Sequence, residues 1–150
     1  MKILITGATG FAGGYLLRYL SNIYGIENVH GTGRSLSKAK ILSDEGFTIK
    51  VGDLVDPEFV NSQLTSYDLV VHCAAKSSVW GSYDSFYKAN VVATKNLLEV
   101  IHSEQQLIYI STANIYFNFG NRRFIREDDP LPNPFNNHYA ATKYEAEQIV

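Results

Sequence analysis

The chain has 150 residues, of which 45% are hydrophobic and 19% charged, and its formal net charge is −2. This length suits one domain with a sizeable core and is too short for two large domains. The charge balance gives no basic field that would favour nucleic acid or an anionic membrane, and no apolar run approaches the ~20 residues of a bilayer span.

The N-terminal stretch MKILITGATG lacks the long apolar run and the small-residue cleavage site of a signal peptide. The chain has a single cysteine, Cys73, inside the apolar run LVVHCAA. We therefore expect a buried core thiol in a reducing compartment, and hence a cytoplasmic protein. The four histidines have no metal-ligand spacing, so no metal site is expected.

Short β-rich runs alternate with amphipathic helical patterns, which predicts a parallel sheet with crossover helices. The expected strands are 2–6, 28–33, 47–53, 68–75 and 106–111. The expected helices are 11–23, 35–45 with Gly46 as its C-terminal cap, one that begins at Asp56-Pro57, 85–103 and 137–150. Five such units predict a doubly wound α/β fold. A long irregular stretch, 112–136, holds three of the four prolines, and such a length favours a functional loop.

A glycine-rich turn, TGATGFAGG, joins the first expected strand to the first helix. Gly7, Gly10 and Gly13 leave room for a sharp turn, for a pyrophosphate at the helix N-terminus, and for close packing of helix on strand. The strand before the turn and the helix after it are the context that this motif requires. We therefore expect a Rossmann-type dinucleotide-binding domain over residues 1–150, with Thr9 and Phe11 among the cofactor contacts. A purely structural turn is the alternative.

Together with the sequence YAATK at 139–143, this turn makes the chain resemble the extended branch of the short-chain dehydrogenase/reductase superfamily. Six motifs carry the resemblance in order: TGATGFAGG, GDL at 52–54, HCAA at 72–75, Asn90 in KANVVATKNLLE, IST at 110–112, and YAATK. The stretch from HCAAKSSVW to REDDPLP looks most like 3β-hydroxysteroid dehydrogenase-like members. The branch also includes NAD-dependent sugar-nucleotide epimerases and dehydratases.

The resemblance implies further cofactor contacts. Asp53 and Leu54 match the family residues near the adenine ring, and Ala74 and Ala75 match the small residues against which the cofactor lies. For these positions a helix cap or ordinary core packing are the alternatives.

The end of the second strand usually decides between NAD and NADP. The expected acidic position falls at about Gly33, and Arg34 follows it, with Ser35 and Lys38 close by. Because an arginine forms a bidentate pair with phosphate, we expect NADP ahead of NAD. The alternative is a solvated surface arginine.

Tyr139 and Lys143 lie four residues apart and so share one helix face. A phenol with its ordinary pKa of about 10 is a poor base, but a nearby ammonium and a positive nicotinamide favour the phenolate. Lys143 can also hold the nicotinamide ribose. The resemblance assigns the substrate-orienting hydroxyl to Thr112, with Ser111 as the possible misassignment, and makes Asn90 a support for the lysine. An exposed helix pair without chemistry is the alternative.

Two function classes follow. The first is the cofactor domain of an oxidoreductase or epimerase, which transfers hydride at a carbinol carbon of a sterol-like alcohol or ketone, or of a nucleotide sugar. The second is a non-catalytic dinucleotide-binding or redox-sensing module. Ala113 and Asn114 replace the acidic pair of family dehydratases, which disfavours dehydration. Family members are longer, so we expect a fold truncated before its substrate domain. Such a chain need not be active alone. The resemblance also implies a possible homodimer through helices near 85–103 and 137–150.

Overall fold

The computed structural model describes residues 1–78, 80–120 and 122–150 and confirms the α/β fold. Its parallel sheet has the strand order β3-β2-β1-β4-β5. The strands are β1 Ile3–Thr6, β2 Val29–Gly33, β3 Ile49–Val51, β4 Leu69–His72 and β5 Gln106–Tyr109. The helices are α1 Phe11–Tyr24, α2 Leu36–Asp44, α3 Pro57–Gln63, α4 Tyr83–Tyr87, α5 Ala93–Val100 and α6 His138–Glu147. The order of the strands reverses between β1 and β4, where such sheets open a crevice for ligands.

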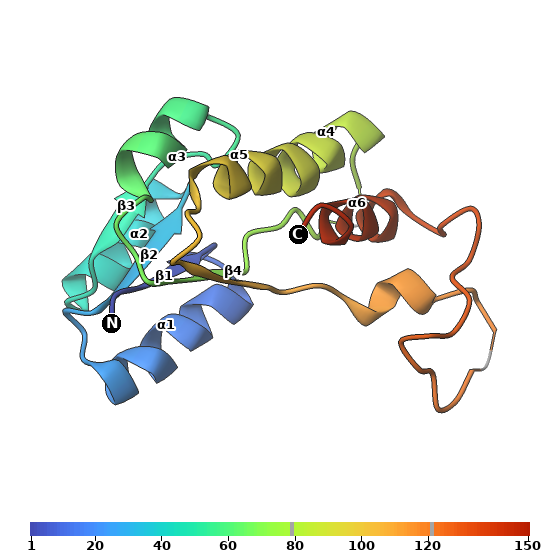
Figure 1. Cartoon of the computed structure of the whole chain (residues 1–150), viewed down its shortest axis with the longest axis horizontal. Coiled ribbons are helices and arrows are strands. Elements are labelled where there is room, and N and C mark those ends of the chain that lie inside the picture. Colours follow the sequence, from blue (N-terminus) through green and yellow to red (C-terminus); the bar gives the residue numbers. More distant parts are fainter. Residues whose placement is uncertain (79, 121) are drawn as a thin grey trace.

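Strand β1 is the centre of the molecule, and all four of its residues are buried. Successive side chains of a strand point to opposite faces, so Ile3 and Ile5 pack beneath α1 and α2, whereas Leu4 packs beneath α3 and α5. Helices thus cover both faces of the sheet (Figure 1). This double cover explains why the strands read as nearly continuous apolar runs.

Local signals in the sequence fix several helix ends. The side chain of Asp56 accepts a hydrogen bond from the Glu58 N–H, and Pro57 is the first residue of α3. Gly46 follows α2 with a φ of +98°, the left-handed conformation that glycine adopts at a helix C-terminus. Asn137 caps α6 through the Ala140 N–H. These ends agree with the sequence patterns.

The helix expected over 85–103 differs most from its prediction. It begins at Tyr83, ends at Val100, and contains a π-helical turn, Lys88–Val92, between α4 and α5. A π turn holds one residue more than an α turn, which periodicity alone does not reveal, and it is frequent at functional sites. In addition, a 3₁₀ turn, Ala113–Tyr116, lies within the expected irregular stretch.

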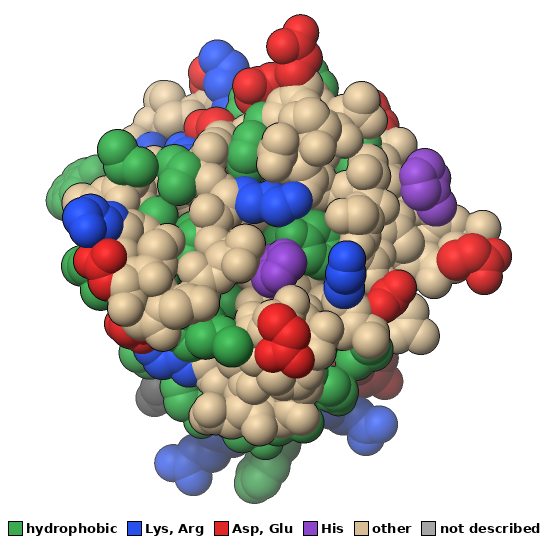
Figure 2. Space-filling model, turned by 90° about the vertical axis from the view of Figure 1, so that its left-hand side faces the viewer, with side chains coloured by type: hydrophobic (Ala, Val, Ile, Leu, Met, Phe, Trp, Pro, Cys, Tyr) green, Lys and Arg blue, Asp and Glu red, His purple; other side chains and the backbone are tan. Residues whose placement is uncertain are grey.

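The distribution of charge on the surface can be followed on one face of the molecule. On the face shown in Figure 2, basic and acidic side chains are interspersed. Within the described residues, no helix combines the length and the apolar composition that crossing a membrane requires.

The core predicts a large difference between two helical leucines. Leu97 of α5 is fully buried, whereas Leu36 of α2 is 73% exposed. We expect Leu97→Ala to lower the free energy of unfolding by about 2–5 kcal/mol, because it leaves a cavity in the core. Leu36→Ala is the matched control and should change it by no more than about 0.5 kcal/mol. Urea unfolding measures both, and equal losses would contradict the assignment of the core.

Candidate active site

The carboxyl ends of the strands open onto a cavity of about 390 Å³. Its wall combines the turn after β1, the ends of β2 and β3, the segment after β4, and helix α6. All twelve residues that the sequence predicts to bind a cofactor lie in this wall: Gly7, Thr9, Gly10, Phe11, Gly13, Arg34, Asp53, Leu54, Ala74, Ala75, Tyr139 and Lys143. The structure therefore gathers residues from both ends of the chain.

Two glycines of the turn, Gly7 and Gly13, have no room for a side chain. Gly7 has a φ of +68°, and a Cβ on it would lie 2.8 Å from the Ala74 Cα. A Cβ on Gly13 would lie 2.3 Å from the Gly7 carbonyl oxygen. The N-cap of α1 is Gly10, which offers no side-chain acceptor to the first N–H groups of the helix. This arrangement fits a pyrophosphate, because the backbone can approach it closely and the helix N-terminus attracts anions.

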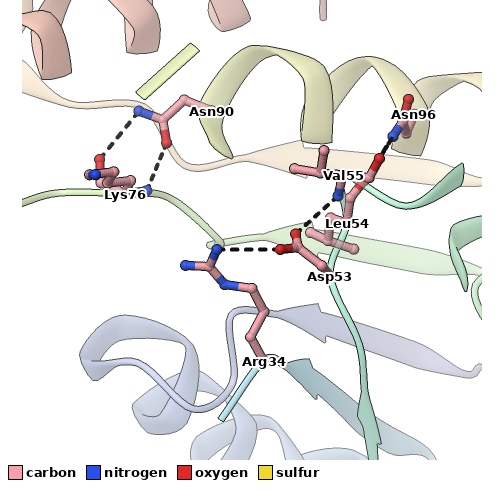
Figure 3. Close-up of polar contacts among 7 residues, drawn as sticks. All are labelled: Arg34, Asp53, Leu54, Val55, Lys76, Asn90 and Asn96. Carbon is pink, nitrogen blue, oxygen red and sulfur yellow. Dashed lines mark hydrogen bonds and ion pairs between the residues drawn. The ribbon is translucent and has the colours of Figure 1, made fainter. Parts of the chain in front are cut away.

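Arg34 and Asp53 face each other at the ends of β2 and β3 (Figure 3). The Arg34 Nη1 lies 3.4 Å from the Asp53 Oδ2, and both side chains are exposed. Asp53 also accepts a hydrogen bond from the Val55 N–H at 3.1 Å. A Cβ on Gly33 would lie 2.4 Å from the Thr9 Oγ1, so the acidic residue that usually binds a ribose hydroxyl would fit here only if Thr9 shifted.

Asn96 supports this part of the site, and the sequence analysis missed it. Its side-chain amide donates to the Leu54 and Val55 carbonyls at 3.0 and 2.9 Å and so fixes the loop after β3 (Figure 3). Asn96 lies more than forty residues further along the chain. A polar residue is ordinary in an amphipathic helix, so the sequence carried no signal for this role.

Lys143 is a buried cation, 2% exposed, on the face of α6 that turns to the cavity. Its ammonium donates to the Ile110 carbonyl at 2.6 Å and lies 3.9 Å from the centre of the Tyr109 ring. Burial lowers the pKa of Lys143 to about 8, and Cys73 and Glu147 oppose this shift. Tyr139 lines the same cavity one helical turn away.

Asn90 is buried in the π-helical turn and does not line the cavity. Its side chain accepts from the Lys76 N–H at 2.7 Å and donates to the Lys76 carbonyl at 3.3 Å (Figure 3). It also donates to the Thr142 Oγ1 at 3.0 Å. Its contact with the helix of Lys143 is thus made through the neighbouring residue, Thr142.

The structure separates the two candidate hydroxyls. Ser111 lies in the wall of the first cavity and donates to the Glu147 carboxylate. Thr112 does not border this first cavity but lines an adjacent one of about 580 Å³, which Ser111 also borders. The Thr112 hydroxyl accepts the Asn114 N–H at 3.2 Å, so its own hydrogen is free to donate elsewhere. The alternative between the two hydroxyls therefore stays open.

Cys73, expected as a core thiol, is half-buried: it packs against the core below α1 and also borders the cavity. Burial raises the pKa of its thiol. Among the described residues, no group of three or more His, Cys, Asp and Glu side chains is placed to hold a metal ion.

The comparison with known proteins identifies the family. The family described as the NAD dependent epimerase/dehydratase family matches residues 3–150, and the chain belongs to it. The predicted resemblance to extended short-chain dehydrogenases/reductases is thereby confirmed.

Several curated relatives match the whole chain. It is 36% identical to 2-alkyl-3-oxoalkanoate reductase of Stenotrophomonas maltophilia and 35% identical to the uncharacterized protein YbjS of Escherichia coli, and each match covers 100% of the chain. The chain spans 46% and 45% of these two proteins, less than half of their length.

Solved structures share the fold. dTDP-glucose 4,6-dehydratase of Bacillus anthracis, in complex with NAD, is 25% identical with a TM-score of 0.79 over 99% of this chain and 49% of its own. UDP-glucuronic acid 4-epimerase of Bacillus cereus, also with NAD, is 27% identical with a TM-score of 0.77 over 99% and 51%.

The buried lysine predicts a pH effect on stability. Below about pH 8, folded and unfolded chains both hold the proton, whereas between about 8 and 10.5 the folded chain loses it first. The free energy of unfolding should therefore rise with pH in this window, by on the order of 2 kcal/mol, relative to a Lys143→Met variant. Urea unfolding of both chains at several pH values measures the difference. Parallel curves would contradict the lowered pKa.

Proposed function

We propose that this chain is the cofactor-binding domain of an NAD(P)-dependent oxidoreductase acting at a carbinol or carbonyl carbon. The observation that supports this most directly is one cavity wall that holds the glycine turn, the Arg34–Asp53 pair and the Tyr139–Lys143 pair. A nucleotide-binding module alone has no need for a phenol and a buried ammonium at the far end of the same cavity.

In this proposal the nicotinamide ring supplies or accepts hydride, and the chain moves the proton. In the direction of reduction, the Tyr139 hydroxyl gives its proton to the carbonyl oxygen as the hydride arrives at carbon. The Lys143 ammonium stabilises the phenolate that remains and holds the nicotinamide ribose. Thr112, or Ser111 in its place, donates a hydrogen bond that orients the substrate oxygen.

Two groups of relatives support different substrates. Reductases of 2-alkyl-3-oxoalkanoates, at 36% and 32% identity, and a sterol-4-alpha-carboxylate 3-dehydrogenase, at 31%, favour a ketone or alcohol near a carboxylate. The solved epimerase and dehydratase structures favour a nucleotide sugar as the second candidate. Ala113 and Asn114 disfavour dehydration, and we therefore propose a ketone reductase or alcohol dehydrogenase first.

We also propose NADP as the preferred cofactor, although the solved relatives named above contain NAD. Gly33 supplies no acidic side chain at the end of β2, and the exposed Arg34 can exchange its long contact with Asp53 for a phosphate. A cytoplasmic location, and a homodimer through α4, α5 and α6, belong to the same proposal.

The cofactor assignment predicts thermal shifts. At about a hundred times the dissociation constant, NADPH and NADP⁺ should raise the melting temperature by about 5 °C or more. Arg34→Ala should lose most of this shift and keep the smaller shift with NADH. Arg18→Ala is the matched control, because Arg18, on α1, forms an ion pair with Glu45 at the C-terminal end of α2, outside the cavity wall. Absence of a shift with NADPH, NADP⁺, NADH and NAD⁺ would contradict the dinucleotide site, and a larger shift with NADH would contradict the NADP preference.

The acid–base role predicts the behaviour of Tyr139→Phe. This variant should bind NADPH as the wild type does but reduce a 3-oxo ester or acid roughly 10²–10⁴-fold more slowly, since it lacks the proton donor. Tyr144→Phe, on the same helix but outside the cavity wall, should keep full activity. Absorbance at the NADPH band measures turnover. Because a cofactor domain need not be active alone, turnover is measured on the chain joined to its substrate domain. If that protein binds cofactor and turns over no ketone, alcohol or nucleotide sugar, the non-catalytic module is the better description.

A further inference from the structure

A chain of buried polar side chains crosses the interior next to the cavity and is not explained by the roles assigned above. His72, at the end of β4, is 1% exposed, and Thr6 of β1 and Thr94 of α5 are fully buried. The His72 Nδ1 lies 2.6 Å from the Thr6 Oγ1, and its Nε2 lies 3.0 Å from the Thr94 Oγ1. A buried imidazole between two hydroxyls can have only certain protonation states.

The neighbouring groups determine the direction of these hydrogen bonds. The Thr94 hydroxyl donates to the Asn90 carbonyl at 2.6 Å, and a carbonyl can only accept, so Thr94 must accept from the Nε2–H of His72. At the other end, the Thr6 hydroxyl accepts the Ala74 N–H at 3.1 Å and donates to Nδ1. Burial and the nearby Lys143 lower the pKa of His72 to about 3, so it stays neutral.

The far end of this hydrogen-bonded network reaches helix α6. Asn90, whose carbonyl Thr94 holds, extends its side chain to the Thr142 Oγ1 at 3.0 Å. Thr142 in turn donates to the His138 carbonyl at 2.7 Å, so its oxygen is free to accept from Asn90. Hydrogen bonds therefore run without interruption from Ala74, beside the glycine turn, to the residue before Lys143.

A second route joins His72 to the same helix. His72 and Tyr109 are partners in the β4–β5 register, and their ring centres lie 5.7 Å apart. The Tyr109 hydroxyl donates to the Lys143 carbonyl at 3.3 Å, and the Lys143 ammonium lies over the Tyr109 ring. A neutral His72 is not repelled by this ammonium. A charged His72 would be repelled by it, because both groups lie near the Tyr109 ring.

We propose that His72, through Thr94 and Asn90, is a positioning residue that sets the place of Tyr139 and Lys143 relative to the cofactor. This inference rests on the proposed function. Apolar residues of similar size could fill the same space, since replacing both partners of a buried hydrogen bond by apolar groups can be nearly neutral for stability. A fully paired network, in contrast, allows one arrangement of the elements that it joins.

Thr94 offers the sharper pair of variants. Thr94→Val keeps the shape of the side chain but removes the hydroxyl, whereas Thr94→Ser keeps the hydroxyl. His72→Leu and His72→Gln form a second pair, in which only glutamine can still donate and accept. Val71→Ala is the control for stability alone, because Val71 precedes His72 on β4 and packs in the core below α1.

The readout compares two ligands of the full chain. NADPH spans the whole cavity, whereas 2′,5′-ADP lacks the nicotinamide ribose that Lys143 holds. We expect Thr94→Val to weaken NADPH binding about tenfold and to leave 2′,5′-ADP binding unchanged, because misplacing α6 affects only the nicotinamide half. Thr94→Ser should bind NADPH as the wild type does. The losses of NADPH affinity caused by Thr94→Val and His72→Leu should not add in the double variant, since both substitutions interrupt the same hydrogen-bonded network.

Equal weakening of both ligands, or no weakening of NADPH, in a folded Thr94→Val variant would overturn the proposal. NMR spectra of the ligand-free chain provide a test that does not depend on cofactor binding. The His72 nitrogens should show the Nε2–H tautomer without protonation down to pH 5, and Thr94→Val should shift the signals of residues 139–143 more than Val71→Ala does. If wild-type protein binds neither these two ligands nor NADH, the proposed function fails, and these spectra alone decide whether His72 positions α6. Unshifted α6 signals, or a protonated His72, would refute that role.

Discussion

The close approach of Gly13 to the Gly7 carbonyl is the constraint on which the site depends. Any Cβ at Gly13 would lie within 2.3 Å of that oxygen, so the first turn of α1 could not lie against the end of β1. The same turn brings Ala74, in the segment after β4, against Gly7. Because β1 and β4 are neighbours at which the strand order reverses, their loops separate there and leave a cavity with an uncapped helix N-terminus at its floor.

The opposite wall has a different physical basis. Helix α6 places a lysine where water is scarce, which lowers its pKa, and the protein compensates with a carbonyl, an aromatic face and the carboxylate of Glu147. A buried ammonium without such partners would be strongly unfavourable. A helix with a purely structural role would not need a buried ammonium and its free-energy cost.

Local patterns predicted much of this arrangement, and distant contacts were beyond them. The glycine turn, the Asp56-Pro57 helix start and the Gly46 cap lie where the sequence indicated, since each depends on a short motif. The residues expected at the cofactor all border one cavity. The π-helical turn at Lys88–Val92 was missed because one added residue leaves the apolar pattern nearly intact. The partners of His72 could not be read from a local pattern, because Thr6 and Thr94 lie 66 and 22 residues away.

These distant contacts have a structural consequence for the whole site. The polar chain from Ala74 to Thr142 begins beside the turn that would hold the pyrophosphate and ends beside Lys143, and so it joins the two walls of the cavity through the interior. Opening the cavity by moving α6 away from the sheet would break buried hydrogen bonds that water cannot replace, at a cost of about 1–3 kcal/mol for each group left unpaired. The described residues of the loop between β5 and α6 take no part in this network and can move without this cost. Adaptation to a substrate is therefore expected in the loop between β5 and α6, while the distance between the glycine turn and the Tyr139–Lys143 face stays nearly fixed.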